Sequence, residues 1–443
     1  MRSVVRSRAL LSDPRFLSLW LSQGIAQTAQ NALLFTLLVV VLQITGSSIH
    51  TSLLVLSFIL PSIPLGFIVG VLLDRVDKGP VLVATNLARA GACVLFFFFH
   101  DSEWTIYLIS MGIATAGLFF NPAVVSVIPS IVPRDRLVPA NSLYNFTLTA
   151  SQLIGIVFVA PTMLKIFGAN GMFVSGAVLF GVAALCAARI GPVHRTVDGR
   201  PTQPPTLASI PTEFRESWHA LASDRYSVLA LSQLIMSSTL VLLFAILIPR
   251  YMQDVLDVPA DSAALVFAPT GIGALVGLRF VPWFARQGKN HAVVVGLFGL
   301  AVCLVLLALV EPIAELWKSG PDAVDPSRLL RVSLLQALVM SFAAPMGFFY
   351  ALLNAPAQTI LHERAPPEMR GRIFATQVVS ANFISLLPLL LIGAVTDIVN
   401  ITPVLLLLAA AMATLGFVSN SVGSPPERQR AEAREPESAG SRN

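Results

Sequence analysis

The hydrophobic positions of this chain fall into long unbroken stretches separated by short polar segments. Stretches of about 18 or more apolar residues have the length that an α-helix needs to cross a bilayer. Because the first stretch is longer than a signal-peptide core and no cleavage site follows it, we expect it to remain in the mature protein. Twelve predicted spans lie near residues 16–43, 51–73, 80–99, 104–128, 138–166, 171–190, 226–253, 261–285, 291–311, 330–361, 372–396 and 401–420.

This pattern predicts an all-α membrane protein with twelve transmembrane helices in two pseudo-symmetric six-helix bundles. The longest polar insert between spans runs from Gly191 to Arg225. Its second part, from Glu213, is expected to form an amphipathic helix on the membrane surface. The tail is too polar to fold and is expected to be disordered. The expected parts are an N-terminal six-helix bundle (1–190), a cytoplasmic linker (191–225), a C-terminal six-helix bundle (226–420) and a disordered cytoplasmic tail (421–443).

Composition and charge agree with a membrane protein. Hydrophobic residues make up 55% of the chain and charged residues 12%, whereas a soluble domain carries about 25% charged residues. The net charge of +5 comes from residues between the spans that form no basic face, so a nucleic-acid partner is not expected. Of the 29 basic residues, 23 are predicted to lie on the same side of the membrane as the N-terminus and five on the other side, and Arg89 lies within a span. The positive-inside rule therefore predicts a plasma-membrane protein with both termini in the cytoplasm.

The two halves of the chain share residues in the same order. Leu21-Ser22-Gln23 aligns with Leu231-Ser232-Gln233 at an offset of 210, and Asn121 aligns with Asn354 at an offset of 233. The larger outside loop from Glu311 to Arg331 can supply most of the additional residues. Internal repeats of this kind are typical of transporters, in which the substrate site lies between the repeats.

A short motif follows the second span, with Gly70 and Asp74 four residues apart. Gly70 allows close approach of a neighbouring helix, and Asp74 can face the positive N-terminal end of the eleventh span, near Arg372. The alternative is that Asp74 ends the span in a solvated loop. Arg89 lies in the third span, where an unpaired cation costs about 2.5–3.5 kcal/mol at mid-bilayer. It either serves a specific partner or extends to the cytoplasmic surface.

The run Gly70-Val-Leu-Leu-Asp74-Arg75-Val-Asp77-Lys78 resembles the loop signature of the major facilitator superfamily, G-x-L-x-D-R-x-x-R/K. Phe16 to Gln23 and Arg370-Gly371-Arg372 resemble the branch of bacterial exporters that includes macrolide efflux pumps and the enterobactin exporter. The resemblance implies that spans one, four, seven and ten line a central pathway. It also implies a latch between the halves that favours the outward-open state, formed by Gly70, Asp74, Arg75, Lys78 and Arg89. Gly79 and Pro80 stand where relatives carry further basic residues, so part of this charge network is missing.

Amide side chains form a stripe on the first span. Gln23, Gln27, Gln30 and Asn31 lie at i, i+4, i+7 and i+8 and therefore share one helix face. Since amides exposed to lipid are unfavourable, the stripe is expected to line a substrate cavity, with packing between helices as the alternative. Packing is the favoured role for span five, and Asn121 and Asn354 are expected to bond carbonyls freed by the following prolines. The other cavity candidates are Asn145, Gln233, Ser237 and Gln377.

Proton-coupled antiport needs a side chain that changes protonation within the pathway. No Asp or Glu lies deep in any span. Where relatives carry an acid in the first span, this chain has Gln30, and span five lacks their Gly-Pro signature. The resemblance thus implies proton antiport, whereas the residues of the spans partly contradict it. Asp74 and Asp397 remain as the candidate proton-binding residues.

Enzymatic and metal-binding functions have no sequence support. The motifs GxxxxGK[ST], HExxH and GxSxG are absent. Cys93, Cys186 and Cys303 are far apart in apolar segments, so no disulfide, metal site or cofactor is expected. We therefore predict a monomeric secondary transporter that exports a small neutral or amphipathic organic compound, such as a drug, a macrolide-like natural product or a siderophore. The alternatives are a lipid or lysolipid flippase of the same fold and a non-transporting membrane sensor.

Overall fold

A computed structural model describes most of the chain. The described residues are 10–73, 76–133, 136–191, 215–216, 218–219, 221–259, 263–319, 333–364 and 370–423. Every regular element within these ranges is a helix. Most of the predicted linker and all but three residues of the predicted tail lie outside the described residues. Of the expected amphipathic helix, residues 215–216, 218–219 and 221–225 are described, and those up to 222 are helical.

The first half of the chain begins with a capped helix and contains a break in its second span. The Asp13 carboxylate accepts from the backbone N–H of Arg15 at 2.8 Å, which satisfies a free donor at the start of α2. Pro61 and Pro64 lack backbone N–H groups, which interrupts the helical ladder between α3 and α4. The helices of this half are α2 (Pro14–Thr45), α3 (Ser48–Ile59), α4 (Ser62–Leu73), α5 (Lys78–Phe99), α6 (Glu103–Ile131), α7 (Leu137–Leu153), the π-helix η2 (Ile154–Val159) and α8 (Ala160–Ala188).

The fifth span is divided between three elements. It runs through α7 and η2 into the first part of α8, up to Gly168, whose φ of 67° and ψ of −170° break the helix. The remainder of α8 is the sixth span. In the π-helix, a Cβ on Gly155 would lie 2.6 Å from the Thr28 carbonyl oxygen. Only glycine permits this close contact between η2 and α2.

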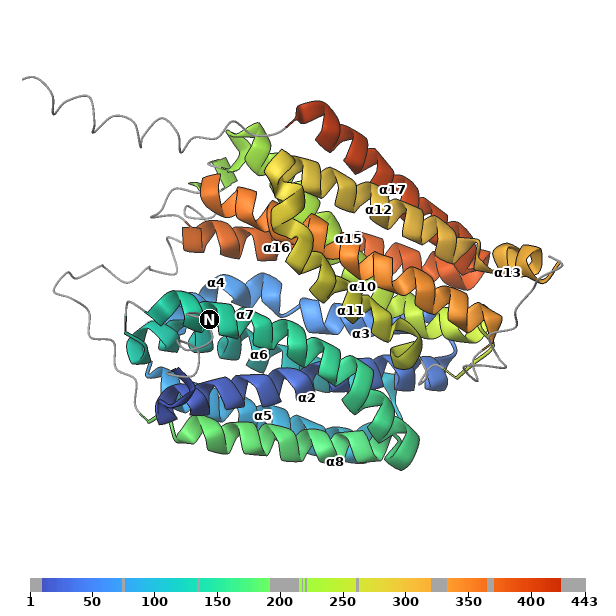
Figure 1. The fold of residues 1–443 in the computed structure, drawn as a ribbon. Helices are drawn as coiled ribbons and strands as arrows, with labels where there is room; N and C mark the ends of the chain where they lie inside the picture. Colours follow the sequence, from blue (N-terminus) through green and yellow to red (C-terminus); the bar gives the residue numbers. More distant parts are fainter. Residues whose placement is uncertain are drawn as a thin grey trace, which may run out of the picture.

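The second half repeats the arrangement with one additional short helix. Asp224 caps α10 by accepting from the Ser227 N–H and hydroxyl. The elements of this half are α10 (Arg225–Asp254), α11 (Ala263–Phe284), the 3₁₀-helix η5 (Ala285–Gln287), α12 (Lys289–Ala308), α13 (Val310–Lys318), α15 (Leu334–Arg364), α16 (Arg370–Val399) and α17 (Ile401–Val422). In Figure 1 the blue-to-green helices form one group and the yellow-to-red helices the other.

The helices run roughly parallel, so the molecule has two ends. We call the end where α2 begins the N-terminal face and the end that carries α13 the opposite face (Figure 1). Eleven described helices are long and apolar enough to cross a membrane, and the interrupted fifth span completes the twelve predicted. Large apolar side chains such as Leu108, Leu185 and Phe417 are about two-thirds exposed or more, which is expected where lipid surrounds the protein.

Each half contains a buried polar cluster at corresponding positions. In the first half, Ser22 of α2 donates to the Ala183 carbonyl oxygen of α8 at 2.8 Å, and Asn86 of α5 donates to Ser22. In the second half, Asn290 of α12 donates to the Ser419 carbonyl oxygen of α17 at 2.7 Å. Gln233 of α10 donates to the Ser419 hydroxyl and to Asn290. Both clusters join the first, third and sixth spans of their half, so the sequence repeat extends to side-chain contacts.

Glycines bring α15 into close contact with its neighbours. A Cβ on Gly273 of α11 would overlap the Ala344 carbonyl of α15. A Cβ on Gly296 of α12 would lie 2.8 Å from the Phe349 carbonyl oxygen of the same helix. Because the backbones themselves are in contact, α11, α12 and α15 pack as one tight unit.

Candidate transport pathway

Two polar bridges occupy equivalent positions in the two halves. Gln27 of α2 donates to the Asn121 side-chain oxygen of α6 at 2.8 Å. Asn354 of α15 donates to the Ser237 hydroxyl of α10 at 3.0 Å. Positions 27 and 237 differ by the offset of 210 found in the first spans, and 121 and 354 by the offset of 233. Each bridge therefore joins the first and fourth spans of its half, and neither asparagine uses its bond on a carbonyl freed by proline.

The rest of the first-span stripe is divided between packing and accessible positions. Gln23 is buried and its amide donates to the Tyr144 carbonyl oxygen of α7 at 3.5 Å. Asn31 is half-buried and donates to the Gln27 carbonyl oxygen in its own helix. Gln30 is half-buried, and its side-chain oxygen is buried without a hydrogen-bond partner in the described part of the chain. Asn121, opposite Gln27, is exposed.

The remaining cavity candidates occupy different surroundings. Gln233 is 1% exposed and lies within the buried cluster with α12 and α17. Ser237 belongs to the second bridge. Gln377 of α16 is 7% exposed and donates to the Gln358 side-chain oxygen of α15 at 3.4 Å. Asn145 lies on α7, and its side chain is outside the described residues.

Two of the five predicted latch residues lie outside the described residues. Asp74 and Arg75 are not described, and Gly70 lies in the last turn of α4. Lys78 is the first residue of α5 and is 7% exposed. The side chain of Arg372, at the other side of the predicted contact, is also outside the description.

Arg89 lies in the interior of the first bundle. It is 2% exposed, and its guanidinium carbon is 4.7 Å from the ring centre of Phe120 and 5.7 Å from that of Phe180. Its Nε is buried without a hydrogen-bond partner, and no carboxylate pairs with it in the described part of the chain. Two aromatic faces thus stabilise this cation in place of an anion.

A carboxylate joins the two halves at the opposite face. Asp397 of α16 accepts from the Ser47 hydroxyl at 2.5 Å and from the backbone N–H groups of Ser48 and Ile49 at 2.9 and 3.3 Å. These donors form the N-terminal end of α3, which attracts negative charge. Arg250 of α10 pairs with Asp397 at 3.3 Å and donates to the Gly46 carbonyl oxygen. We call this group the Asp397 clasp.

The backbones of α3 and α16 approach closely beside the clasp. A Cβ on Gly393 would overlap the Ser52 hydroxyl and lie 2.9 Å from the Ser48 carbonyl oxygen. Gly393 precedes Asp397 by four residues, the same spacing as Gly70 and Asp74. Sequence reasoning considered Asp397 only as a proton carrier, although this repeated Gly-x-x-x-Asp spacing was available as a signal.

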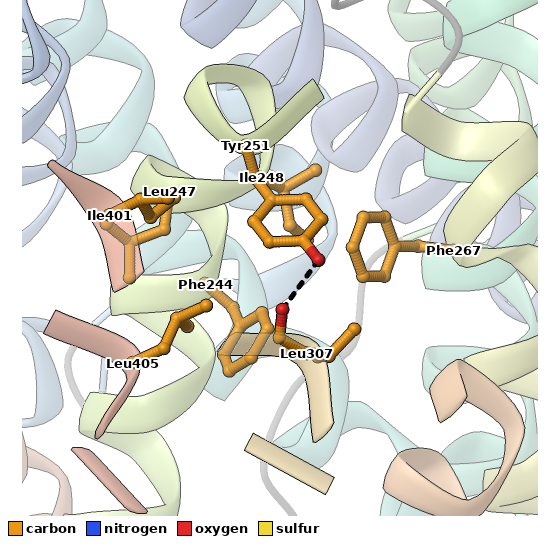
Figure 2. A pocket seen from close by; sticks show the side chains of 8 residues that line it. All are labelled: Phe244, Leu247, Ile248, Tyr251, Phe267, Leu307, Ile401 and Leu405. Atoms are coloured by element: carbon orange, nitrogen blue, oxygen red, sulfur yellow. Dashed lines mark hydrogen bonds between the residues drawn. The ribbon is translucent and has the colours of Figure 1, made fainter. Parts of the chain in front are cut away.

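A small apolar pocket lies between helices of the second bundle. In Figure 2 the Tyr251 hydroxyl donates to the Leu307 carbonyl oxygen, at 2.8 Å, near the C-terminal end of α12. No charged side chain lines the pocket, and we interpret it as a packing gap within one bundle. It is lined by Phe244, Leu247, Ile248, Tyr251, Phe267, Leu307, Ile401 and Leu405.

Comparisons with known proteins agree with this architecture. The chain is 22% identical over 394 residues to the multidrug efflux pump Tap of Mycolicibacterium fortuitum, covering 86% of this chain and 88% of that protein. It is 21% identical over 382 residues to macrolide efflux protein A of Streptococcus pyogenes, covering 79% and 91%. A shorter match, 26% over 189 residues, covers 43% of this chain and 45% of the lysophospholipid transporter LplT of Pectobacterium carotovorum.

The fold and a family model give the assignment. The crystal structure of the nucleoside transporter NupG superposes with a TM-score of 0.70 at 11% identity, covering 92% of this chain and 98% of that one. The family model of the Major Facilitator Superfamily matches residues 19–321. The chain therefore belongs to the Major Facilitator Superfamily and is a multi-pass membrane transporter.

Proposed function

We propose that this protein is a secondary active transporter that exports a neutral or amphipathic organic compound by alternating access. The relatives named for multidrug and macrolide efflux support the outward direction and the drug-like substrate class. By this proposal both termini are cytoplasmic, so the N-terminal face lies inside the cell. The protein acts as a monomer, with residues 1–190 and 226–420 as its moving halves, and has no nucleic-acid partner.

The lining of the proposed pathway supports an uncharged substrate. The two matched bridges, Gln27–Asn121 and Ser237–Asn354, present amides and a hydroxyl from spans one, four, seven and ten. An amide can either donate to or accept from a bound compound. A charged compound would need a fixed countercharge, and the described side chains of the bridges carry none. The proposal thus assigns substrate contacts to these four residues together with Gln30 and Asn31.

The observation that carries alternating access is the one-sided position of the Asp397 clasp. The clasp holds α3, α10 and α16 together at the opposite face. Asp74 ends the second span as Asp397 ends the eleventh, and these two spans run antiparallel. Each aspartate can therefore cap the N-terminal end of the other span, one at each face. We propose that the two caps form alternately, with the clasp closed when the pathway opens to the N-terminal face.

Flux in proteoliposomes tests the proposed function. The compounds are radiolabelled erythromycin, tetracycline, ethidium and uridine, each loaded on one side under an imposed pH gradient. We expect exchange of at least one organic compound, with Gln27→Leu reducing exchange at least ten-fold. Gln253→Leu, an exposed glutamine at the far end of α10, is the matched control and should exchange normally. Binding without flux for every compound would support the sensor instead.

A lysophospholipid flippase is the second candidate, supported by the partial match to LplT. The same vesicles with fluorescent lysophosphatidylethanolamine distinguish the two functions. Flipping of this lipid without exchange of any soluble compound would replace drug export with lipid transport.

A further inference from the structure

The fourth span of the second half, α15, carries a row of polar side chains that sequence analysis did not identify as a group. Tyr350, Asn354, Gln358 and His362 are spaced by four residues and so follow one side of the helix towards the N-terminal face. Asn354 bonds α10 through Ser237. The two residues nearest the N-terminal face form a separate chain of contacts.

That chain links α15 to α16. The Gln377 amide of α16 donates to the Gln358 side-chain oxygen at 3.4 Å. The Gln358 side-chain nitrogen lies 3.1 Å from His362 Nε2. Because a carboxamide nitrogen can only donate, His362 Nε2 is the acceptor in this arrangement. The side-chain oxygen of Gln377 is buried and has no hydrogen-bond partner among the residues that the structure describes.

A proton on His362 Nε2 would reverse this chain. The imidazolium Nε2–H can only donate, so Gln358 must rotate its carboxamide to present the oxygen. The Gln358 nitrogen then points to Gln377, whose unpartnered oxygen can accept once that amide has rotated as well. The Nε2–H bond forms with a proton released by hydronium at the N-terminal face, and no other covalent bond changes. Protonation on α15 is thereby transmitted to α16.

The charges around this end of α15 are largely paired with one another. Glu363 forms an ion pair with Lys289 of α12, and Arg364 pairs at 3.1 Å with Asp224, which caps α10. Arg364 also lies over the Tyr226 ring of α10 at 4.6 Å. The other charged or titratable groups of the packed elements at this face are Arg225 of α10, Arg279 of α11, Arg286 of η5 and His291 of α12; the side chains of Arg370 and Arg372 of α16 are outside the described residues.

Acidic side chains are absent from the interior of the spans. In the described membrane-spanning helices the acids Glu103, Asp254, Glu363 and Asp397 all lie in the first or last turn. Histidine is the side chain whose ordinary titration falls between pH 5 and 8. A histidine joined by amides to α16, the helix that packs against α3 and α4 of the first half, can therefore do what a buried acid does in an antiporter.

We propose that His362 is the proton-binding residue that couples transport to the pH gradient, and that Gln358 and Gln377 transmit its protonation to α16. This inference rests on the proposed transport function. In this proposal the His362 imidazole binds the proton that a carboxylate in the first span binds in relatives, at the position where this chain has Gln30.

The test follows the proposed relay, the chain from His362 through Gln358 to Gln377, without any substrate. In a chain whose three cysteines are replaced by alanine, bimane is attached at Val378→Cys, an exposed position next to Gln377. The fluorescence of the reconstituted protein is recorded from pH 5 to 8.5. We expect one sigmoidal change within this pH range. His362→Asn and His362→Gln should abolish it, and the exposed His291→Asn is the control that should retain it.

A second variant separates proton binding from transmission. Gln358→Leu keeps the imidazole and so leaves the titration of His362, followed by histidine ¹⁵N NMR, while flattening the bimane response. An unchanged bimane curve in either His362→Asn or Gln358→Leu, or no titration in the parent protein, overturns the relay. In the flux assay, His362→Asn should exchange compounds independently of pH. If the parent exchanges none of them, the transport proposal fails, whereas the bimane titration still judges the relay.

Discussion

The substitution Asp397→Asn tests most clearly how strongly the clasp stabilises the closed state of the opposite face. Asp397→Asn removes the charge facing the α3 N-terminus and the ion pair with Arg250, yet leaves one oxygen to accept from Ser48. Replacing a charged by a neutral acceptor costs roughly 1–1.5 kcal/mol, and loss of charge at a helix terminus roughly 0.3–1 kcal/mol. The pair with Arg250 adds less than about 1 kcal/mol, since both side chains are partly exposed.

Together these losses amount to about 2 kcal/mol, which shifts a two-state equilibrium about thirty-fold. The assay is double electron–electron resonance, which measures the distance between spin labels attached at Trp104→Cys and Leu309→Cys. Both are exposed positions at the opposite face, one in each half. We expect Asp397→Asn to enlarge the long-distance population at this face at the expense of the short one.

The control uses the same arginine. Asp254 pairs with Arg250 at 2.5 Å within α10, so Asp254→Asn removes a carboxylate without affecting the other half. Its distance distribution should match that of the parent. Identical distributions for Asp397→Asn and the parent would refute the idea that the clasp holds this face closed.

Three further predictions concern the stability of the bundles. Arg89→Met should raise the unfolding temperature in detergent, because an apolar chain replaces a buried cation that has no carboxylate partner among the described residues; a lower temperature would show that the two aromatic contacts outweigh its desolvation. Gly273→Ala should lower stability by about 1–3 kcal/mol through overlap with the α15 backbone, whereas Gly112→Ala, with open space around its Cβ, should have little effect. Although burial of Asp224 raises its pKa, bonds from Ser227 and the charge of Arg364 outweigh it and hold the pKa below the ordinary value. Asp224 then contributes stability above its unfolded-state pKa and loses it as the pH falls through the folded-state value, so the loss in Asp224→Asn, measured by thermal unfolding, should be the same at pH 5.5 and 7.5.

The spans could be predicted from the sequence because the bilayer demands one apolar stretch per crossing, which is a property of local sequence alone. The break at Gly168 and the π-helix at Gly155 could not, since both depend on how α7 and α8 pack against α2. Periodicity identified the face of α2 that carries Gln27 but not its partner, and Asn121 received a different role.

The role of a polar side chain followed its position in the internal repeat more closely than its residue type. Gln233 aligns with Gln23, and both are buried in packing contacts within their own halves. Ser237 aligns with Gln27, and both form bridges to the fourth span. Gln358 and His362 were overlooked, although their spacing from Asn354 was visible in the sequence. The Asp397 contact joins residues 350 positions apart, and only the folded chain brings them together.

Accessibility of one pathway residue from each side tests alternating access most directly. Asn121→Cys is introduced in the chain without native cysteines, and a membrane-impermeant maleimide is applied to intact cells and to inverted vesicles. Asn121 is exposed with the clasp closed, so we predict fast labelling from the cytoplasmic side, and a gain of labelling from outside when Asp397→Asn is added. Labelling from the same side at the same rate in both proteins would contradict the account.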